Sequence, residues 1–311
     1  MIMGFIDQMR AKGHAVESIC RVLRQEGCQI AARTYRAWRR RSASARDTSD
    51  AVLLNVLHDL VGTPEGLYGR RKMTAWLRRE GHQVGAGRVD RLMRVAGMNG
   101  VRRGRPVRTT VPAKDGCRAG DLLNRDFTAA APNTKWVADF TYVRTWAGFV
   151  YVAFVLDCYS QRILAWHAAT AKTTPLVLTP LRIALWDRDR HGHPVQPGEL
   201  IAHSDAGSQY TSLRFAEHLA AEGIAASIGT VADAYDNALM ECVIGLYKTE
   251  CITTTIFHNG PYKTIADVEY ATAGWVEWYN NRRLHSSLAM TTPAEYETAY
   301  YAALNRELAP T

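Results

Sequence analysis

Three acidic residues, Asp139, Asp205 and Glu241, have the side-chain type and the surroundings expected of a metal site. Asp205 and Glu241 are separated by 35 residues, and Asp139 lies well upstream of both. Carboxylate oxygens are the protein ligands that Mg²⁺ and Mn²⁺ prefer, and two such ions about 3.5–4 Å apart catalyse phosphoryl transfer. We interpret the three acids as catalytic residues and as metal ligands, and we expect them to hold two Mg²⁺ or Mn²⁺ ions.

The residues around Glu241 have the periodicity of an amphipathic helix. Asn237, Glu241 and Lys248 fall on one polar stripe at about 100° per residue. Taken alone, Lys248 would be interpreted as a solvent-exposed lysine. Because it lies on the same stripe as Glu241, it could contact a DNA phosphate. Asn237 is a second candidate DNA contact. The apolar residues fall on the opposite side and can pack on a sheet: Leu239, Val243 and Leu246.

The start of this helix has its own signals. Asp233 or Asp236 is expected to cap it, because a short acid before an amphipathic run satisfies free backbone N–H groups. Residues 229–234 form a candidate mobile loop over the site.

The elements that must position the acids are read from the change of pattern after Lys135, where β-branched and aromatic residues become frequent. Strands are predicted at 136–143, 149–156, 162–167, 199–203 and 224–228, and helices at 175–188 and 212–222. This order matches an α/β ribonuclease-H-like fold, which is a mixed five-stranded sheet flanked by helices. In that fold the first and fourth strands are neighbours, so Asp139 in the first strand lies close to Asp205 after the fourth.

The distribution of charge points to a nucleic-acid partner. The 311-residue chain has a formal net charge of +8. Residues 1–110 hold 22 Lys and Arg against 9 Asp and Glu, whereas the remainder holds 16 against 21. A basic half rich in patterned arginines is typical of binding to a polyanion such as DNA; the alternative is a merely soluble basic domain.

Two all-α units are expected in this basic half. Residues 1–45 resemble a helix-turn-helix unit, because an amphipathic helix is followed by Gly27 and an Arg-rich helix. Residues 46–104 form a second helical DNA-binding module, and residues 105–134 a basic linker. The candidate DNA contacts on these units are Arg33, Arg36, Arg39, Arg70, Arg71 and Lys72.

The catalytic core is assigned to residues 135–252, and residues 253–311 form a C-terminal helical segment that completes it. A helix is predicted at 265–280. The residues that follow it, Arg282, Arg283 and His285, either contact DNA or have a structural role at the end of that helix. Asp157 is either a turn residue or a ligand.

Several classes of protein lack support. The longest apolar run, 149–156, is too short to span a membrane, and the N-terminus has no signal-peptide pattern. Six cysteines are scattered without a C-x-x-C pair, which favours reduced thiols in a cytoplasmic protein. No phosphate-binding loop, dinucleotide fingerprint or nucleophile elbow is present.

The chain resembles the DDE transposases of the insertion-sequence-three family, and in particular their OrfB subunit. The motifs that carry the resemblance surround the three acids and continue into 278–288 and 292–294, with an upstream module from Tyr68 to Arg94. The resemblance implies a core related to retroviral integrases, metal-dependent DNA cleavage and strand transfer, and Lys248 near the DNA end. It also implies element ends and target DNA as partners, a homo-oligomer on DNA, an upstream-frame subunit or fusion, and a bacterial, nucleoid-associated location.

Two other functions stay open from the sequence. One is a non-catalytic DNA-binding regulator of the element. The other is a ribonuclease or resolvase on the same fold, which would cleave without joining.

Overall fold

The computed structural model describes residues 2–102, 122–123, 126–205, 209–228 and 237–307. It divides into two compact units, residues 1–56 and 57–311. The division falls inside helix α4 (Ala45–Asp59), so the second helical module shares a unit with the catalytic core. Most of the expected basic linker and the expected mobile loop 229–234 lie outside the described residues, as do Asp233 and Asp236.

The first unit consists of short helices around a small apolar cluster. Helices α1 (Ile2–Ala11), α2 (Val16–Gln25) and α3 (Ala32–Arg40) precede α4. The buried residues of the cluster are Ile6, Ile19, Cys20, Ile30 and Tyr35. The Tyr35 hydroxyl donates a hydrogen bond of 2.5 Å to Asp7, which joins α3 to α1.

The second helical module packs through the apolar faces of two helices. A short 3-10 helix, η1 (Pro64–Leu67), precedes α5 (Arg70–Arg79) and α6 (Ala86–Val95). The buried faces consist of Met73 and Leu77 on α5, and of Val89, Leu92 and Met93 on α6. The arginines of both helices occupy the opposite, polar faces, as their spacing predicts.

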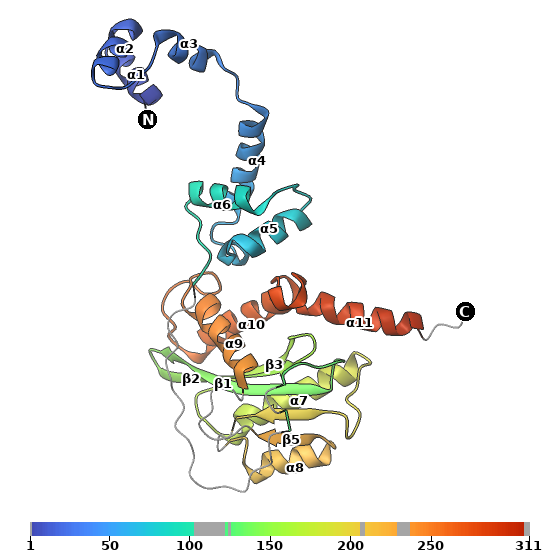
Figure 1. The fold of residues 1–311 in the computed structure, drawn as a ribbon. Helices are drawn as coiled ribbons and strands as arrows, with labels where there is room; N and C mark the ends of the chain where they lie inside the picture. The colour runs from blue at the N-terminus through green and yellow to red at the C-terminus, as the bar shows by residue number, and fades with distance from the viewer. Residues whose placement is uncertain (1, 103–121, 124–125, 206–208, 229–236, 308–311) are drawn as a thin grey trace. The chain divides into compact units, whose positions relative to one another are not determined.

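A five-stranded sheet forms the centre of the second unit, in the order β3-β2-β1-β4-β5 (Figure 1). Its strands are β1 (Lys135–Thr145), β2 (Gly148–Asp157), β3 (Ile163–Ala169), β4 (Ile201–Ser204) and β5 (Ala225–Ile228). The first three pair antiparallel, whereas β4 runs parallel to both β1 and β5. The ribonuclease-H-like fold, and the predicted neighbourhood of the first and fourth strands, are confirmed.

Helices cover both faces of this sheet (Figure 1). Helices α7 (Thr174–Arg190) and α8 (Leu213–Ala221) lie on one face, over a core that includes Leu176, Leu181 and Phe215. The other face carries α9 (Ala238–Leu246), the π-helical segment η3 (Tyr247–Ile252) and α10 (Ile265–Asn281). Phe154 of β2 packs there against Tyr247 and Trp275. The apolar residues of α9 and α10 therefore fix the helix that carries Glu241.

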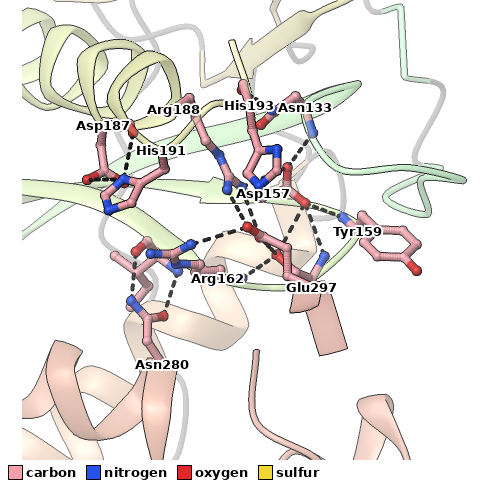
Figure 2. A network of polar contacts seen from close by, with 12 residues as sticks. Asn133, Asp157, Tyr159, Arg162, Asp187, Arg188, His191, His193, Asn280 and Glu297 are labelled. Atoms are coloured by element: carbon pink, nitrogen blue, oxygen red, sulfur yellow. Dashed lines mark hydrogen bonds and ion pairs between the residues drawn. The ribbon is translucent and has the colours of Figure 1, made fainter. Parts of the chain in front are cut away.

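The C-terminal helix α11 (Pro293–Glu307), which follows the short helix η4 (Ser286–Leu288), is held by a buried polar network (Figure 2). Arg188 of α7 is 1% exposed and donates to both carboxylate oxygens of Glu297 on α11. Arg162 adds a third hydrogen bond to Glu297, 3.2 Å long. A buried charge is stable only when it is paired and hydrogen-bonded, and this network meets that condition for Arg188 and Glu297.

Asp157 belongs to the same network and has the turn role that the sequence left open. One of its oxygens accepts from the backbone N–H groups of Tyr159 and Ser160, and the other accepts from Asn133. Asp157 Oδ2 also lies 3.8 Å from Arg188 Nη2. The residue is fully buried within the structural network.

Candidate active site

Asp139 lies in β1 at the point where the strand leaves its parallel neighbour. The last paired residues of β1 and β4 are Ala138 and Ser204, so Asp139 and Asp205 each come one residue beyond them. Because β1 and β4 are parallel and adjacent, the two acids emerge at the same edge of the sheet. The sequence prediction that folding brings Asp139 and Asp205 together agrees with this register.

The electrostatics of Asp139 reflect the other two acids. The pKa of its carboxyl is raised to about 8, first by burial and then by the negative charges of Asp205 and Glu241. The backbone N–H of Phe140, 2.7 Å from Asp139 Oδ1, and the ammonium of Lys248 act in the opposite direction. Like charges shift a pKa in this way only at short range, so the three carboxylates share one electrostatic site.

Glu241 lies in the first turn of α9, and its side chain is exposed. The helix begins after Asn237, whose Nδ2 donates a 3.3 Å hydrogen bond to the backbone carbonyl of Ala138. This contact ties the start of α9 to β1 directly beside Asp139. Asn237 is only 4% exposed, so its role in the structure is to position the helix, and we withdraw it from the candidate DNA contacts.

Lys248 follows α9 in the π-helical segment η3, and its side chain is partly buried. Its Nζ lies 5.0 Å from the centroid of the Tyr142 ring, a residue of β1. Burial lowers the pKa of Lys248, while the nearby charge of Asp139 raises it. The lysine is therefore placed beside the acids, and not on a separate solvated face.

The donors at this site fit a hard divalent cation, since all three are carboxylates. The negative charges of Asp205 and Glu241 oppose ionisation of Asp139. A bound cation would neutralise these charges. Across the described parts of the chain, no three His, Cys, Asp or Glu side chains already converge closely enough to hold an ion.

The structure revises two of the C-terminal DNA-contact assignments. Arg283 is 4% exposed, and its guanidinium donates to the carboxylate of Glu250 at 2.6 and 2.9 Å. His285 is 3% exposed, and its Nε2 lies 3.1 Å from the carbonyl oxygen of Tyr279. Both residues therefore take the structural alternative that the sequence left open. The side chain of Arg282 is about half exposed and stays a candidate contact.

The basic residues of the helical units differ in exposure: the arginines are exposed, whereas Lys72 is partly buried. On α3 the side chains of Arg33, Arg36 and Arg39 are exposed, and Arg36 forms an ion pair with Glu17. At the start of α5, Arg70 and Arg71 are exposed as well.

Lys72 differs from its neighbours Arg70 and Arg71. Its pKa is lowered to about 7, first by burial and then by the charge of Arg283. Its Nζ lies 5.8 Å from the Tyr68 ring centroid. The side chain is partly buried, and its role as a DNA contact stays a prediction.

Several contacts of the second helical module were not predicted from the sequence. Trp278 Nε1 donates to Glu65, and the backbone N–H of Leu284 donates to the Tyr68 hydroxyl. Arg79 pairs with Glu295 on α11. These contacts join the second helical module to the C-terminal segment, and no local periodicity signals them. The buried Arg188 could have been found, because it continues the apolar stripe of Leu181 and Ala184 on α7.

Fold and domain content define the class of the protein as a polynucleotidyl transferase with an integrase-type catalytic core. Models of the integrase core domain match residues 129–234 and 222–293, and an HTH-like domain model matches residues 52–106. Proteins with this core depend on divalent metal.

Curated relatives identify the family. The putative transposase for insertion sequence element IS986/IS6110 of Mycobacterium tuberculosis is 45% identical over 280 residues, which cover 90% of this chain and 99% of the relative. The transposase for insertion sequence element IS629 of Shigella sonnei is 44% identical, with 85% of each chain covered. The chain belongs to the insertion-sequence-three family of DDE transposases, and it is a DNA transposase of an insertion sequence.

Solved structures with a similar fold come from retroviral integration. The simian T-cell lymphotropic virus intasome in complex with a PP2A regulatory subunit is 14% identical, with 74% of this chain and 70% of that chain covered and a TM-score of 0.45. The HTLV-2 integrase catalytic core domain in complex with magnesium is 16% identical, with coverages of 54% and 98% and a TM-score of 0.40. No helix within the described ranges is long and apolar enough to cross a membrane.

Proposed function

We propose that Asp139, Asp205 and Glu241 form the catalytic centre of this transposase and hold two Mg²⁺ or Mn²⁺ ions. The observation that carries the proposal is the register of β1 and β4, in which Asp139 and Asp205 each follow the last paired residue, and the charges of Asp205 and Glu241, which raise the pKa of Asp139, support it. Bound divalent ions would supply Lewis-acid stabilisation of charge at the reacting phosphate and would activate the attacking oxygen.

The protein's own residues prepare the site for this chemistry. The backbone N–H of Phe140 orients the Asp139 carboxylate, and the Asn237 amide holds the first turn of α9 beside β1. These contacts fix two of the three acids on rigid elements, which reduces the reorganisation needed at the moment of reaction. Lys248 places a positive charge on the same side and is proposed to contact a phosphate at the DNA end.

Cleavage and joining are proposed to use this one site in succession. Water first hydrolyses a phosphodiester at the element end, and the freed 3′-hydroxyl then attacks another phosphodiester, from which the 3′-oxygen of the attacked strand leaves. The element ends and the target DNA are the proposed substrates. Arg282, the α3 residues Arg33, Arg36 and Arg39, and the α5 residues Arg70 and Arg71 are proposed DNA contacts.

The assembly and location are proposed from the family. The active form is a homo-oligomer on DNA, either with an upstream-frame subunit or as a fusion with it. Its location is the bacterial cytoplasm, at the nucleoid.

The test is a strand-cleavage and strand-joining assay with the element's own end sequences in Mg²⁺ or Mn²⁺. Asp139→Asn, Asp205→Asn and Glu241→Gln should each abolish both steps and leave DNA binding measurable. Asp189→Asn changes an exposed acid on α7 and should keep both steps. End cleavage retained by any of the three variants would reject the assignment.

The assay also separates the two other functions. A chain that binds element ends but never cleaves them would be a regulator, and one that cleaves without joining would be a nuclease or resolvase.

A further inference from the structure

Three aromatic residues lie on the β1–β2 hairpin, of which Tyr142 and Phe149 are exposed and Tyr151 is partly buried. We call these three residues the aromatic strip. Tyr142 pairs with Tyr151 across the two strands, and Phe149 pairs with Arg144, so these side chains share one face of the hairpin. Tyr142 is 41% exposed and Phe149 is 50% exposed, and their ring centroids are 5.3 Å apart.

Two lysines from other elements reach onto this strip. Lys248 Nζ lies 5.0 Å from the Tyr142 ring centroid, and Lys172 Nζ lies 5.1 Å from that of Tyr151. Both distances are within the range of a cation–π contact. The rings thus carry ammonium groups on their faces, an arrangement that suits a ligand with both flat apolar parts and negative charge.

The strip begins beside the proposed catalytic centre. Tyr142 follows Asp139 by three residues on β1, about 10 Å along the strand, and this odd separation directs the two side chains to opposite faces of the strand. Lys172 is tied to the segment after Asp205, because its carbonyl oxygen accepts a 3.1 Å hydrogen bond from Gln209 Nε2. Lys248 connects the two faces, because it follows the helix that carries Glu241 and its ammonium lies at the Tyr142 ring. A DNA strand held at Lys248 would therefore lie next to the strip.

We propose that the aromatic strip binds unpaired nucleobases of single-stranded DNA at the reacting end, an inference that rests on the proposed function. Each base stacks on a ring of Tyr142 or Phe149, and the ammonium groups of Lys172 and Lys248 turn from the rings to the adjacent phosphates. Stacking on aromatic side chains tolerates any base sequence, whereas a basic groove holds the backbone. A second copy of the chain would offer no phosphates to Lys172 and Lys248. It therefore fits the aromatic strip less well than single-stranded DNA does.

The test uses the full chain without divalent metal and a single-stranded oligothymidylate of about 16 nucleotides, with one thymine replaced by the fluorescent base 2-aminopurine. Phe149→Ala and the double variant Tyr142→Ala/Phe149→Ala should weaken single-strand binding by about five- to hundredfold. The quenching of the fluorescent base that stacking causes should disappear with them. Binding to blunt duplex DNA should change little.

Matched variants separate stacking from folding. Tyr142→Phe keeps the ring and should keep the quenching. Trp186→Ala removes another exposed aromatic with a cation beside it, Arg190 at 5.1 Å on α7, and should leave single-strand binding unchanged.

Two outcomes would overturn the proposal. Unchanged single-strand affinity and quenching in Phe149→Ala and in the double variant would do so. Loss of self-association with single-strand affinity intact would do so as well, because the strip would then cover a second copy. The binding test contains no divalent metal and does not depend on catalysis. If the wild type failed in the separate strand-transfer assay, that result would therefore contradict the proposed function and not the binding of single-stranded DNA.

Discussion

Glu250 and Arg283 form a buried ion pair in which Glu250 Oε1 lies 2.6 Å from Arg283 Nη2. Glu250 belongs to η3, two residues after Lys248. The residues on either side of Arg283 contact the second helical module, because Tyr68 donates to the carbonyl of Arg282 and accepts from the N–H of Leu284. The pair therefore links the segment that carries Lys248 to the segment that holds the helical module.

Replacing one member of this pair should destabilise the protein strongly. Arg283→Met leaves Glu250 buried and unpaired, which costs about 3–5 kcal/mol of unfolding free energy. The double variant Glu250→Gln/Arg283→Met should recover part of that loss. Urea unfolding measures both, and Arg282→Met, at a half-exposed position, should cost less than about 1 kcal/mol. Equal effects of Arg282→Met and Arg283→Met would contradict the structural role of the pair.

The stability of the protein should fall as the pH falls below about 6.5. Burial, together with the charges of Arg283 and Lys72, lowers the pKa of His285 well below its ordinary value. The unfolded chain then takes up a proton that folded His285 does not, so this stability is present above pH 6.5 and is lost below it. One such histidine contributes a slope of up to about 1.4 kcal/mol per pH unit.

His285→Gln isolates this contribution. Burial also lowers the pKa of His167, His193 and His218, so the wild type combines several slopes of the same sign. The difference between wild type and variant, followed by urea unfolding from about pH 5 to pH 7.5, belongs to position 285. Parallel curves for the two proteins would mean that His285 is not buried in its neutral form.

Asp139→Asn should stabilise the protein at neutral pH when no divalent cation is present. The pKa of Asp139 is raised to about 8 in the folded state, so its contribution to stability is lost as the pH rises from its unfolded value toward 8. Asparagine has no carboxyl group to ionise, so the variant does not lose this stability as the pH rises. Added Mg²⁺ at about a hundred times its dissociation constant should stabilise the wild type by about 2.7 kcal/mol. The Asn variant should gain much less, and Asp189→Asn should behave as the wild type. Equal gains in all three proteins would place the cation elsewhere.

The arginines of α3 should contribute to the salt dependence of DNA binding. Arg33→Gln/Arg39→Gln should weaken duplex binding and reduce the slope of log K against log salt by about 0.9 for each phosphate that the variant no longer neutralises. Fluorescence anisotropy at several salt concentrations gives the slope. Arg182→Gln, on the exposed side of α7, is the matched control and should leave it unchanged. An unaltered slope in the α3 variant would assign the main DNA grip to other residues.

Local patterns predicted the strands, with Asp139 in the first of them and Asp205 directly after the fourth. Alternating apolar residues predicted the antiparallel strands, and the predicted first strand, 136–143, lies within the observed Lys135–Thr145. The neighbourhood of β1 and β4 came from the order of elements, and it placed Asp139 beside Asp205 correctly.

The contacts between distant segments could not be predicted in the same way. Arg283 and His285 stand in a polar turn sequence, and a surface role was as reasonable as a structural one. Only the contacts of Arg283 with Glu250 and of His285 with Tyr279 decide between the two. Lys72 shows the same limit, since its spacing on α5 predicts a polar face that the C-terminal segment covers. One-dimensional periodicity reports which face of a helix is polar, and it does not report what packs on that face.

The convergence of the three acids on a common cation is tested most directly by iron-mediated cleavage of the protein backbone. Fe²⁺ can occupy a carboxylate site for Mg²⁺ and, with ascorbate and peroxide, cuts the chain beside the bound ion. We predict fragments that end near Asp139, Asp205 and Glu241 together, which disappear when excess Mg²⁺ is added and in Asp139→Asn. Cuts confined to one of these segments, or located elsewhere and insensitive to Mg²⁺, would contradict a shared metal site.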